Sequence, residues 1–173
     1  MKQIVKFFAI AIALVAISAA SHAQSASATA TATATIVSPI AIANAGDLNF
    51  GNIVATVAGG TVTVATDNSR TATGVTLPAA AGTVTAAHFN VTGTPNFTYT
   101  IAITGTPVTV TSGLNTMTVD AFVSAPVAGA GTGLLDGTGA QTIDVGATLN
   151  VGASQPAGTY VSGTPFTVTV NYN

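Results

Sequence analysis

Few side chains in this chain could carry acid–base chemistry. After residue 23, His88 is the only histidine, so a hydrolytic triad would have a single candidate base. It neighbours Phe89 in an alternating segment, where the phenylalanine faces the core and the histidine faces outward. The acids do not pair as a glycosidase requires, because they are scattered among turns. They are Asp47, Asp67, Asp120, Asp136 and Asp144. We therefore expect no catalytic residue and no enzyme activity.

Metal and phosphate sites are not predicted either. Zinc lacks cysteine ligands, since the chain has none, and calcium lacks the closely spaced acids of a binding loop around Asp67 or Asp136. The glycine clusters at 59–60 and 129–139 lack the lysine of a phosphate-binding loop. We expect neither a metal nor another cofactor.

Residues 1–23 have the pattern of a secretory signal peptide. Lys2 and Lys6 precede an apolar run, residues 7–17, and Ser21-His22-Ala23 is a small-x-small cleavage site. The run is too short to span a membrane, and no later segment is longer, so we expect no transmembrane segment after cleavage. The predicted location is the periplasm in transit, then the cell surface or the medium.

Cleavage also changes the charge of the chain. It leaves Arg70 as the only fixed positive charge against five aspartates, so the net charge is one minus five, or −4, with His88 neutral. Nucleic-acid binding needs a basic face that displaces counterions, and this composition excludes it.

The remaining sequence predicts an all-β domain over residues 38–173. Short alternating segments rich in Thr and Val are separated by Gly- and Pro-containing turns, which is typical of an antiparallel Greek-key β-sandwich of immunoglobulin-like or pilin-like type. We expect a hairpin formed by residues 84–91 and 97–103, a loop over 124–139, and two separate short strands at 143–145 and 149–151.

In the segment before this domain, residues 24–37, positions 25–36 alternate strictly. One face is small and apolar, the other consists of Ser and Thr, and the segment has no charge, Gly or Pro. Its apolar face, a candidate for self-assembly, comprises Ala26, Ala28, Ala30, Ala32, Ala34 and Ile36. A low-complexity linker is the alternative to a strand. A strand could pair with its own sheet or with that of another copy, and the pattern does not separate the two.

Several segments together resemble a known family. They are Thr31 to Ile40 leading to Asp47-Leu-Asn-Phe-Gly51, Phe89 to Pro95, Asn115 to Asp120, Val145 to Gly152, and Phe166 to Asn173. They are similar to secreted bacterial proteins grouped as domain of unknown function 4402. More distantly, the layout resembles spore-coat-U proteins and archaic chaperone–usher pilins. The chain departs from that wider group in lacking paired cysteines and in carrying Ala where donor strands carry bulky residues.

The pilin resemblance implies how the chain would function. It implies an N-terminal donor strand that fills a neighbour's sandwich, with a homopolymer, a periplasmic chaperone and an outer-membrane usher as partners. It also implies a C-terminal recognition strand, for which the candidates are Phe166, Val168, Val170 and Tyr172. We therefore predict a secreted, self-associating, pilin-like fibre subunit at the cell surface. The alternative is a monomeric secreted module that binds a glycan or another surface polymer.

Overall fold

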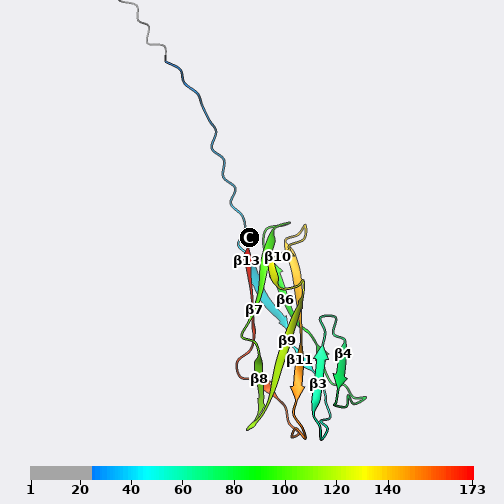
Figure 1. The fold of residues 1–173 in the computed structure, drawn as a ribbon. Coiled ribbons are helices and arrows are strands. Elements are labelled where there is room, and N and C mark those ends of the chain that lie inside the picture. Colours follow the sequence, from blue (N-terminus) through cyan, green and yellow to red (C-terminus); the bar gives the residue numbers. More distant parts are fainter. Residues whose placement is uncertain (1–24) are drawn as a thin grey trace, which may run out of the picture. The chain divides into compact units, whose positions relative to one another are not determined.

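A computed structural model describes residues 25–173 of the chain (Figure 1). The predicted signal peptide, residues 1–23, lies outside the described residues. The chain divides into two units, residues 1–35 and residues 36–173. In the first unit, residues 25–35 are exposed and belong to no strand. Among the described residues, all the strands belong to the second unit.

The second unit is built entirely from β-strands, and every pairing among them is antiparallel. This confirms the β-sandwich fold class predicted from the alternating segments. The strands are β1 (Ala41–Gly46), β2 (Asn49–Phe50), β3 (Gly60–Val64), β4 (Arg70–Thr73), β5 (Val84–Thr85), β6 (Ala87–Thr92), β7 (Thr98–Thr104), β8 (Val108–Ser112), β9 (Asn115–Ala125), β10 (Gly129–Leu134), β11 (Ala140–Val151), β12 (Val161–Ser162) and β13 (Thr167–Tyr172).

Strand β11 is the axis of the main sheet, whose order is β1-β6-β11-β9-β8-β12. Residues 140–145 of β11 pair with β6, and residues 147–151 pair with β3 on the same side. Two separate strands were expected here, and that prediction is wrong because Gly146 does not end the strand. A Cβ at Gly146 would overlap the carbonyl of Val64, so this glycine lets β3 approach while the alternation continues.

A second, three-stranded sheet in the order β10-β7-β13 covers only part of the main sheet. Between the two sheets lies a fully enclosed core that includes Tyr99, Leu135, Ile143 and Val145, all with no exposed surface. We call this part the closed half. Figure 1 shows β7, β10 and β13 at one end of the domain and β3, β4 and β8 at the other. The latter strands, with residues 115–122 of β9 and 147–151 of β11, form what we call the open half.

The predicted hairpin of residues 84–91 and 97–103 is wrong. Strand β6 belongs to the main sheet, where it pairs with β1 and β11, whereas β7 belongs to the second sheet and pairs with β10 and β13. The turn at residues 93–96 therefore crosses between layers. Alternation correctly indicated one buried face for each strand, but it cannot tell which sheet that face closes.

The predicted loop over residues 124–139 is also corrected, because it contains β10. The glycines that suggested a loop are needed for packing: a Cβ at Gly133 would overlap the ring of Tyr99 on the paired strand β7. Glycine in a strand often marks such a close approach. Strand β10 thus covers the tyrosine that fills the closed half.

Candidate functional site: an apolar groove in the open half

The open half has a second apolar cluster, which no complete sheet covers. Its buried members are Val62, Val108, Val119, Ala147, Leu149 and Val151. Around them lie side chains that are only partly buried, among them Phe50, Ile53, Val110, Met117 and Phe166. Half-buried aromatic and aliphatic groups over a buried sheet face indicate that one layer is incomplete.

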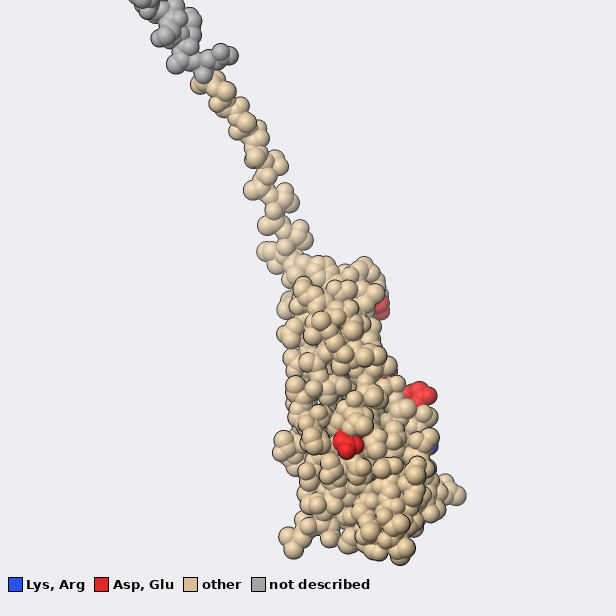
Figure 2. Space-filling view, viewed as in Figure 1, with Lys and Arg blue, Asp and Glu red and all other residues tan. Residues whose placement is uncertain are grey.

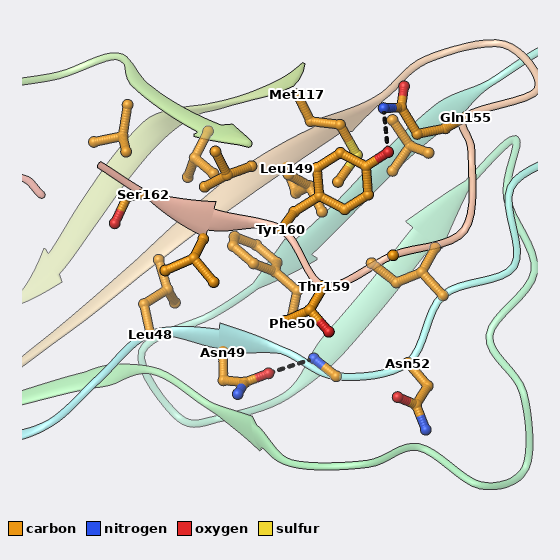
Figure 3. Close-up of a pocket in the computed structure, with 18 of the residues that line it drawn as sticks. Leu48, Asn49, Phe50, Asn52, Met117, Leu149, Gln155, Thr159, Tyr160 and Ser162 are labelled. Carbon is orange, nitrogen blue, oxygen red and sulfur yellow. Dashed lines mark hydrogen bonds between the residues drawn. The ribbon is translucent and has the colours of Figure 1, made fainter. Parts of the chain in front are cut away.

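A groove of about 1220 Å³ runs over this cluster (Figure 3). Its floor is formed by residues of β8, β9 and β11, including Val110, Met117 and Leu149. Residues 47–55 form one wall and residues 155–166 form the other. In Figure 3 the labelled side chains of Leu48, Phe50, Tyr160, Leu149 and Met117 follow one another across the pocket.

The first wall is held from its outer side. Strand β2 pairs with β5, the N–H of Asn52 donates to the carbonyl of Ala81 at 2.7 Å, and Val54 bridges to Thr76. Gly51 has a φ of 69° and shifts the alternation, as its position in the sequence predicted, so that Phe50 and Ile53 both line the groove.

Arg70 holds the backbone of the same wall through its guanidinium group. Its Nη1 donates to the carbonyls of Phe50 at 2.8 Å and Asn52 at 3.1 Å. The one fixed positive charge of residues 24–173 is thus used to position backbone, and it does not line the groove. Hydrogen bonds to a charged donor are stronger than neutral ones, so this wall keeps its shape without support from the groove side.

The second wall is held to β8 and to itself. Val161 and Ser162 of β12 pair with Thr111 and Val110. The hydroxyl of Tyr160 donates to the carbonyl of Pro156 at 2.8 Å and accepts from Nε2 of Gln155 at 2.8 Å. Tyr160 therefore helps to shape this wall of the groove.

The two walls do not pair with each other. Within residues 25–173, no backbone hydrogen bond joins residues 47–55 to residues 156–166, and the backbone N–H and C=O of Ile53 have no hydrogen-bond partner. Unpaired backbone groups along a sheet edge are a template for another strand. The groove thus offers an apolar floor together with free backbone groups.

The groove carries almost no charge. Asp47 is the only Asp, Glu, Lys or Arg among its lining residues. Figure 2 shows how few charged side chains appear on the visible face of the molecule. An occupant of this groove would have to be neutral and largely apolar on the side that faces the floor.

The predicted assembly residues lie in two places. Ala26, Ala28, Ala30, Ala32, Ala34 and Ile36 are exposed and belong to no strand, and Ile36 is 97% exposed. Of the candidate recognition strand, only Phe166 lines the groove. Val168 and Val170 are buried in the closed half, and Tyr172 packs edge-on against Phe97 with ring centroids 5.6 Å apart. The single chain does not bring the two sets together in one sheet.

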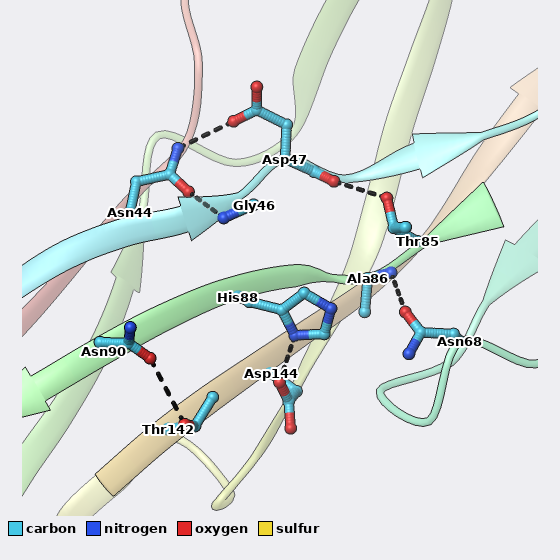
Figure 4. Close-up of polar contacts among 10 residues, drawn as sticks. All are labelled: Asn44, Gly46, Asp47, Asn68, Thr85, Ala86, His88, Asn90, Thr142 and Asp144. Carbon is cyan, nitrogen blue, oxygen red and sulfur yellow. Dashed lines mark hydrogen bonds and ion pairs between the residues drawn. The ribbon is translucent and has the colours of Figure 1, made fainter. Parts of the chain in front are cut away.

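His88 forms a surface pair away from the groove (Figure 4). Its Nδ1 lies 2.5 Å from Oδ1 of Asp144, directly across from it on β11, and both side chains are about one-third exposed. Among the described residues, no three His, Cys, Asp or Glu side chains gather as a metal site would require. Figure 4 shows Asn44 bonded to Asp47 and to Gly46 within one turn. The other nearby polar groups bond between segments: Thr85 to the carbonyl of Asp47, the N–H of Ala86 to Asn68, and Thr142 to Asn90.

Asp67 and Asp136 lie in turns, as predicted, and their carboxylates accept hydrogen bonds from the residues that follow them. The side-chain hydrogen bond from Thr138, then backbone N–H groups of Ala140 and Thr138, lower the pKa of Asp136. Bonds from Ser69 lower the pKa of Asp67 in the same way. In the closed half, burial raises the pKa of Tyr99, whose hydroxyl donates to Oε1 of Gln141 at 2.6 Å.

Between residues 25 and 173, no helix has the length and apolar character needed to cross a membrane.

Comparison with known families gives one match. The model of the family described as "Domain of unknown function (DUF4402)" covers residues 40–172. The chain belongs to this family. The family match confirms the resemblance predicted from the sequence motifs, and it covers both sheets and the whole groove but not the alternating segment. Neither the curated proteins nor the solved structures yield a match.

The floor of the groove is what the sequence did not indicate. By alternation Met117 and Val119 share one face of their strand, and Phe122 is out of phase with them. The structure explains this by a β-bulge: Ala121 has a φ of 47°, and the register with β11 shifts at this point, which turns Phe122 inward. That bulge is the one local signal that could have placed Phe122 in the groove.

Proposed function

We propose that this protein is a secreted, self-associating structural subunit of a pilin-like surface fibre, assembled by β-strand donation. The observation that carries the proposal is the groove in the open half, an apolar sheet face with free backbone groups on its walls. The donor would be the alternating segment over residues 24–37, which contains no charged residue and no proline.

Strand addition fits both partners chemically. An extended segment contributes main-chain hydrogen bonds, while alternate side chains enter pockets and determine specificity. The alanine face of the segment would cover the half-buried Phe50 and Met117, and its Ser and Thr face would remain in water. Small side chains suit this groove because its walls already contribute large ones.

The proposal includes export and assembly partners. Passage through the periplasm after removal of residues 1–23, a periplasmic chaperone and an outer-membrane usher all follow from the pilin resemblance of the sequence. A subunit with an open apolar groove would also need such protection, since exposed apolar patches promote aggregation.

The experiment introduces two carboxylates on one face of the segment at a time. In the double variant Ala30→Asp, Ala32→Asp, two charges enter the apolar face, and we expect polymers to disappear because an unpaired carboxylate cannot be buried in the groove. The matched control Thr31→Asp, Thr33→Asp places the same charges on the hydroxyl face and should still polymerise. Light scattering and electron microscopy of the purified protein distinguish the two. Polymers that persist in the alanine variant would contradict the proposal.

A second function is favoured by the polar rim of the same groove. Asn49, Asn52, Thr159 and Tyr160 surround an apolar floor, which is an arrangement that could hold a glycan chain. This would make the protein a monomeric binding module. Binding of a defined polysaccharide by a clean monomer, lost in Tyr160→Ala, would support this function over the fibre.

A further inference from the structure

The point where the N-terminal segment joins the domain, at Ser38, is held by hydrogen bonds to the closed half. The N–H of Ser38 donates to Oγ1 of Thr94 at 2.9 Å, and its carbonyl accepts from that hydroxyl at 3.2 Å and from the hydroxyl of Tyr172 at 3.0 Å. Thr94 also donates its N–H to the Tyr172 hydroxyl at 2.7 Å. These contacts hold the point at which the segment leaves the domain beside the end of β13.

The groove lies in the other half of the domain, so the anchor at Ser38 and the proposed acceptor are in different halves of the same unit. Its floor uses β8 and the parts of β9 and β11 that pair with β8 and β3. A contact that uses two different ends of a molecule is heterologous, and unless it closes into a ring it continues as a filament.

Resting on the proposed function, we propose a specific acceptor: residues 26–36 of a second copy enter this groove between the first wall, residues 47–55, and β12. The acceptor edges are then the backbone at Ile53 and the free side of β12, and not β13. The contact joins the closed half of one copy to the open half of the next, in a head-to-tail series.

Strand β13 is the edge of its own sheet, but it lies outside the groove. It pairs with β7 from Thr167 to Tyr172, and its buried side chains Val168 and Val170 face the closed core. Ile40, just before β1, and Ile42, in β1, pack against the same core, so that core is already covered. Only Phe166, just before the strand, reaches the groove.

The length of the segment agrees with a head-to-tail contact. The eleven residues from Ala26 to Ile36 span roughly 36 Å when extended, at about 3.3 Å per residue. The floor from Met117 to Phe122, six residues, extends over roughly 20 Å by the same measure. The segment can therefore fill the groove and still bridge to its own domain.

Disulfide trapping tests this acceptor, because the chain has no cysteine of its own. Four variants combine Met117→Cys in the groove with one of Ala28→Cys, Ala30→Cys, Ala32→Cys or Ala34→Cys. A second set uses Val110→Cys in place of the Met117 change. Each control carries Thr118→Cys, which lies next to Met117 in sequence but on the opposite face of β9. The readout is the oxidised chain starting at Gln24, run on a non-reducing denaturing gel.

We expect a ladder of covalent multimers for at least one groove pair, at least tenfold stronger than for its Thr118 control. The tail positions that cross-link then give the register. If electron microscopy shows fibres but none of the groove pairs gives a ladder, the acceptor is wrong and the proposed function stands. A cross-linked monomer would also overturn the inference, because the segment would then pair in its own chain. Absence of both fibres and ladders in well-folded protein, checked by thermal unfolding, would overturn both.

Discussion

The two halves of this sandwich use the same kind of strand and reach different degrees of closure. In the closed half, β10, β7 and β13 complete the second layer, and Tyr99, Ile143 and Val145 have no exposed surface. In the open half, Phe50 on the first wall and Val110 and Met117 on the floor of the groove remain partly exposed. The difference shows that one layer is complete in the single chain and the other is not, so stability and assembly are expected to depend on different residues.

The largest expected effect is on assembly, and it comes from the groove of the open half. Met117→Glu places a charge in the groove, and we expect it to abolish polymers because the incoming strand would bury that charge. Thr118→Glu adds the same charge on the outer face and should leave polymers intact. Sedimentation of the purified proteins measures the polymer fraction. Equal loss in both variants would contradict a role for the groove that is distinct from general solubility.

The second prediction compares how much each half contributes to the free energy of unfolding of the monomer. Ile143→Ala in the closed half should lower the free energy of unfolding by about 2–5 kcal/mol, because it leaves a cavity in an enclosed core. Met117→Ala should cost on the order of 1 kcal/mol, since the side chain is only partly buried. Denaturant unfolding of non-polymerising protein measures both. Similar costs would mean that the groove is closed in solution.

The smallest effect concerns the strand that closes the second layer. Gly133→Ala should cost about 1–3 kcal/mol, because the added methyl overlaps the ring of Tyr99. Gly137→Ala, in the turn that follows β10, meets no atom within 4 Å and should change stability by less than about 0.5 kcal/mol. Thermal unfolding of the two variants makes the comparison. A Gly133 variant as stable as the Gly137 variant would show that β10 does not pack against Tyr99 in solution.

The sequence indicated buried faces reliably and pairings poorly. Local spacing alone places Leu48 and Phe50 on the inward face, and Ile53 joins them after a phase shift at Gly51; all three line the groove. Period-two alternation depends only on neighbouring residues, so a single sequence suffices for it.

Pairing depends on residues far apart in the chain, which is why it was missed. The floor of the groove comes from residues 108–122 and 149–151, and its walls come from 47–55 and 155–166. Nothing local to these segments indicates that they meet. The same holds for β6 and β7, which adjoin in sequence and lie in different sheets, and for β10, whose glycines resemble a loop until Tyr99 is seen above them.

The contact of Ser38 with Tyr172 has a mechanical consequence. A pull on the N-terminal segment would reach β1 through the chain and β13 through the tyrosine hydroxyl, so two strands in different sheets would share the load. Tyr172 lies opposite Tyr99 at the end of six consecutive residue pairs between β13 and β7. Force along these strands would have to shear many hydrogen bonds together and could not open them one at a time. The start and the end of the domain therefore act as a single anchor point.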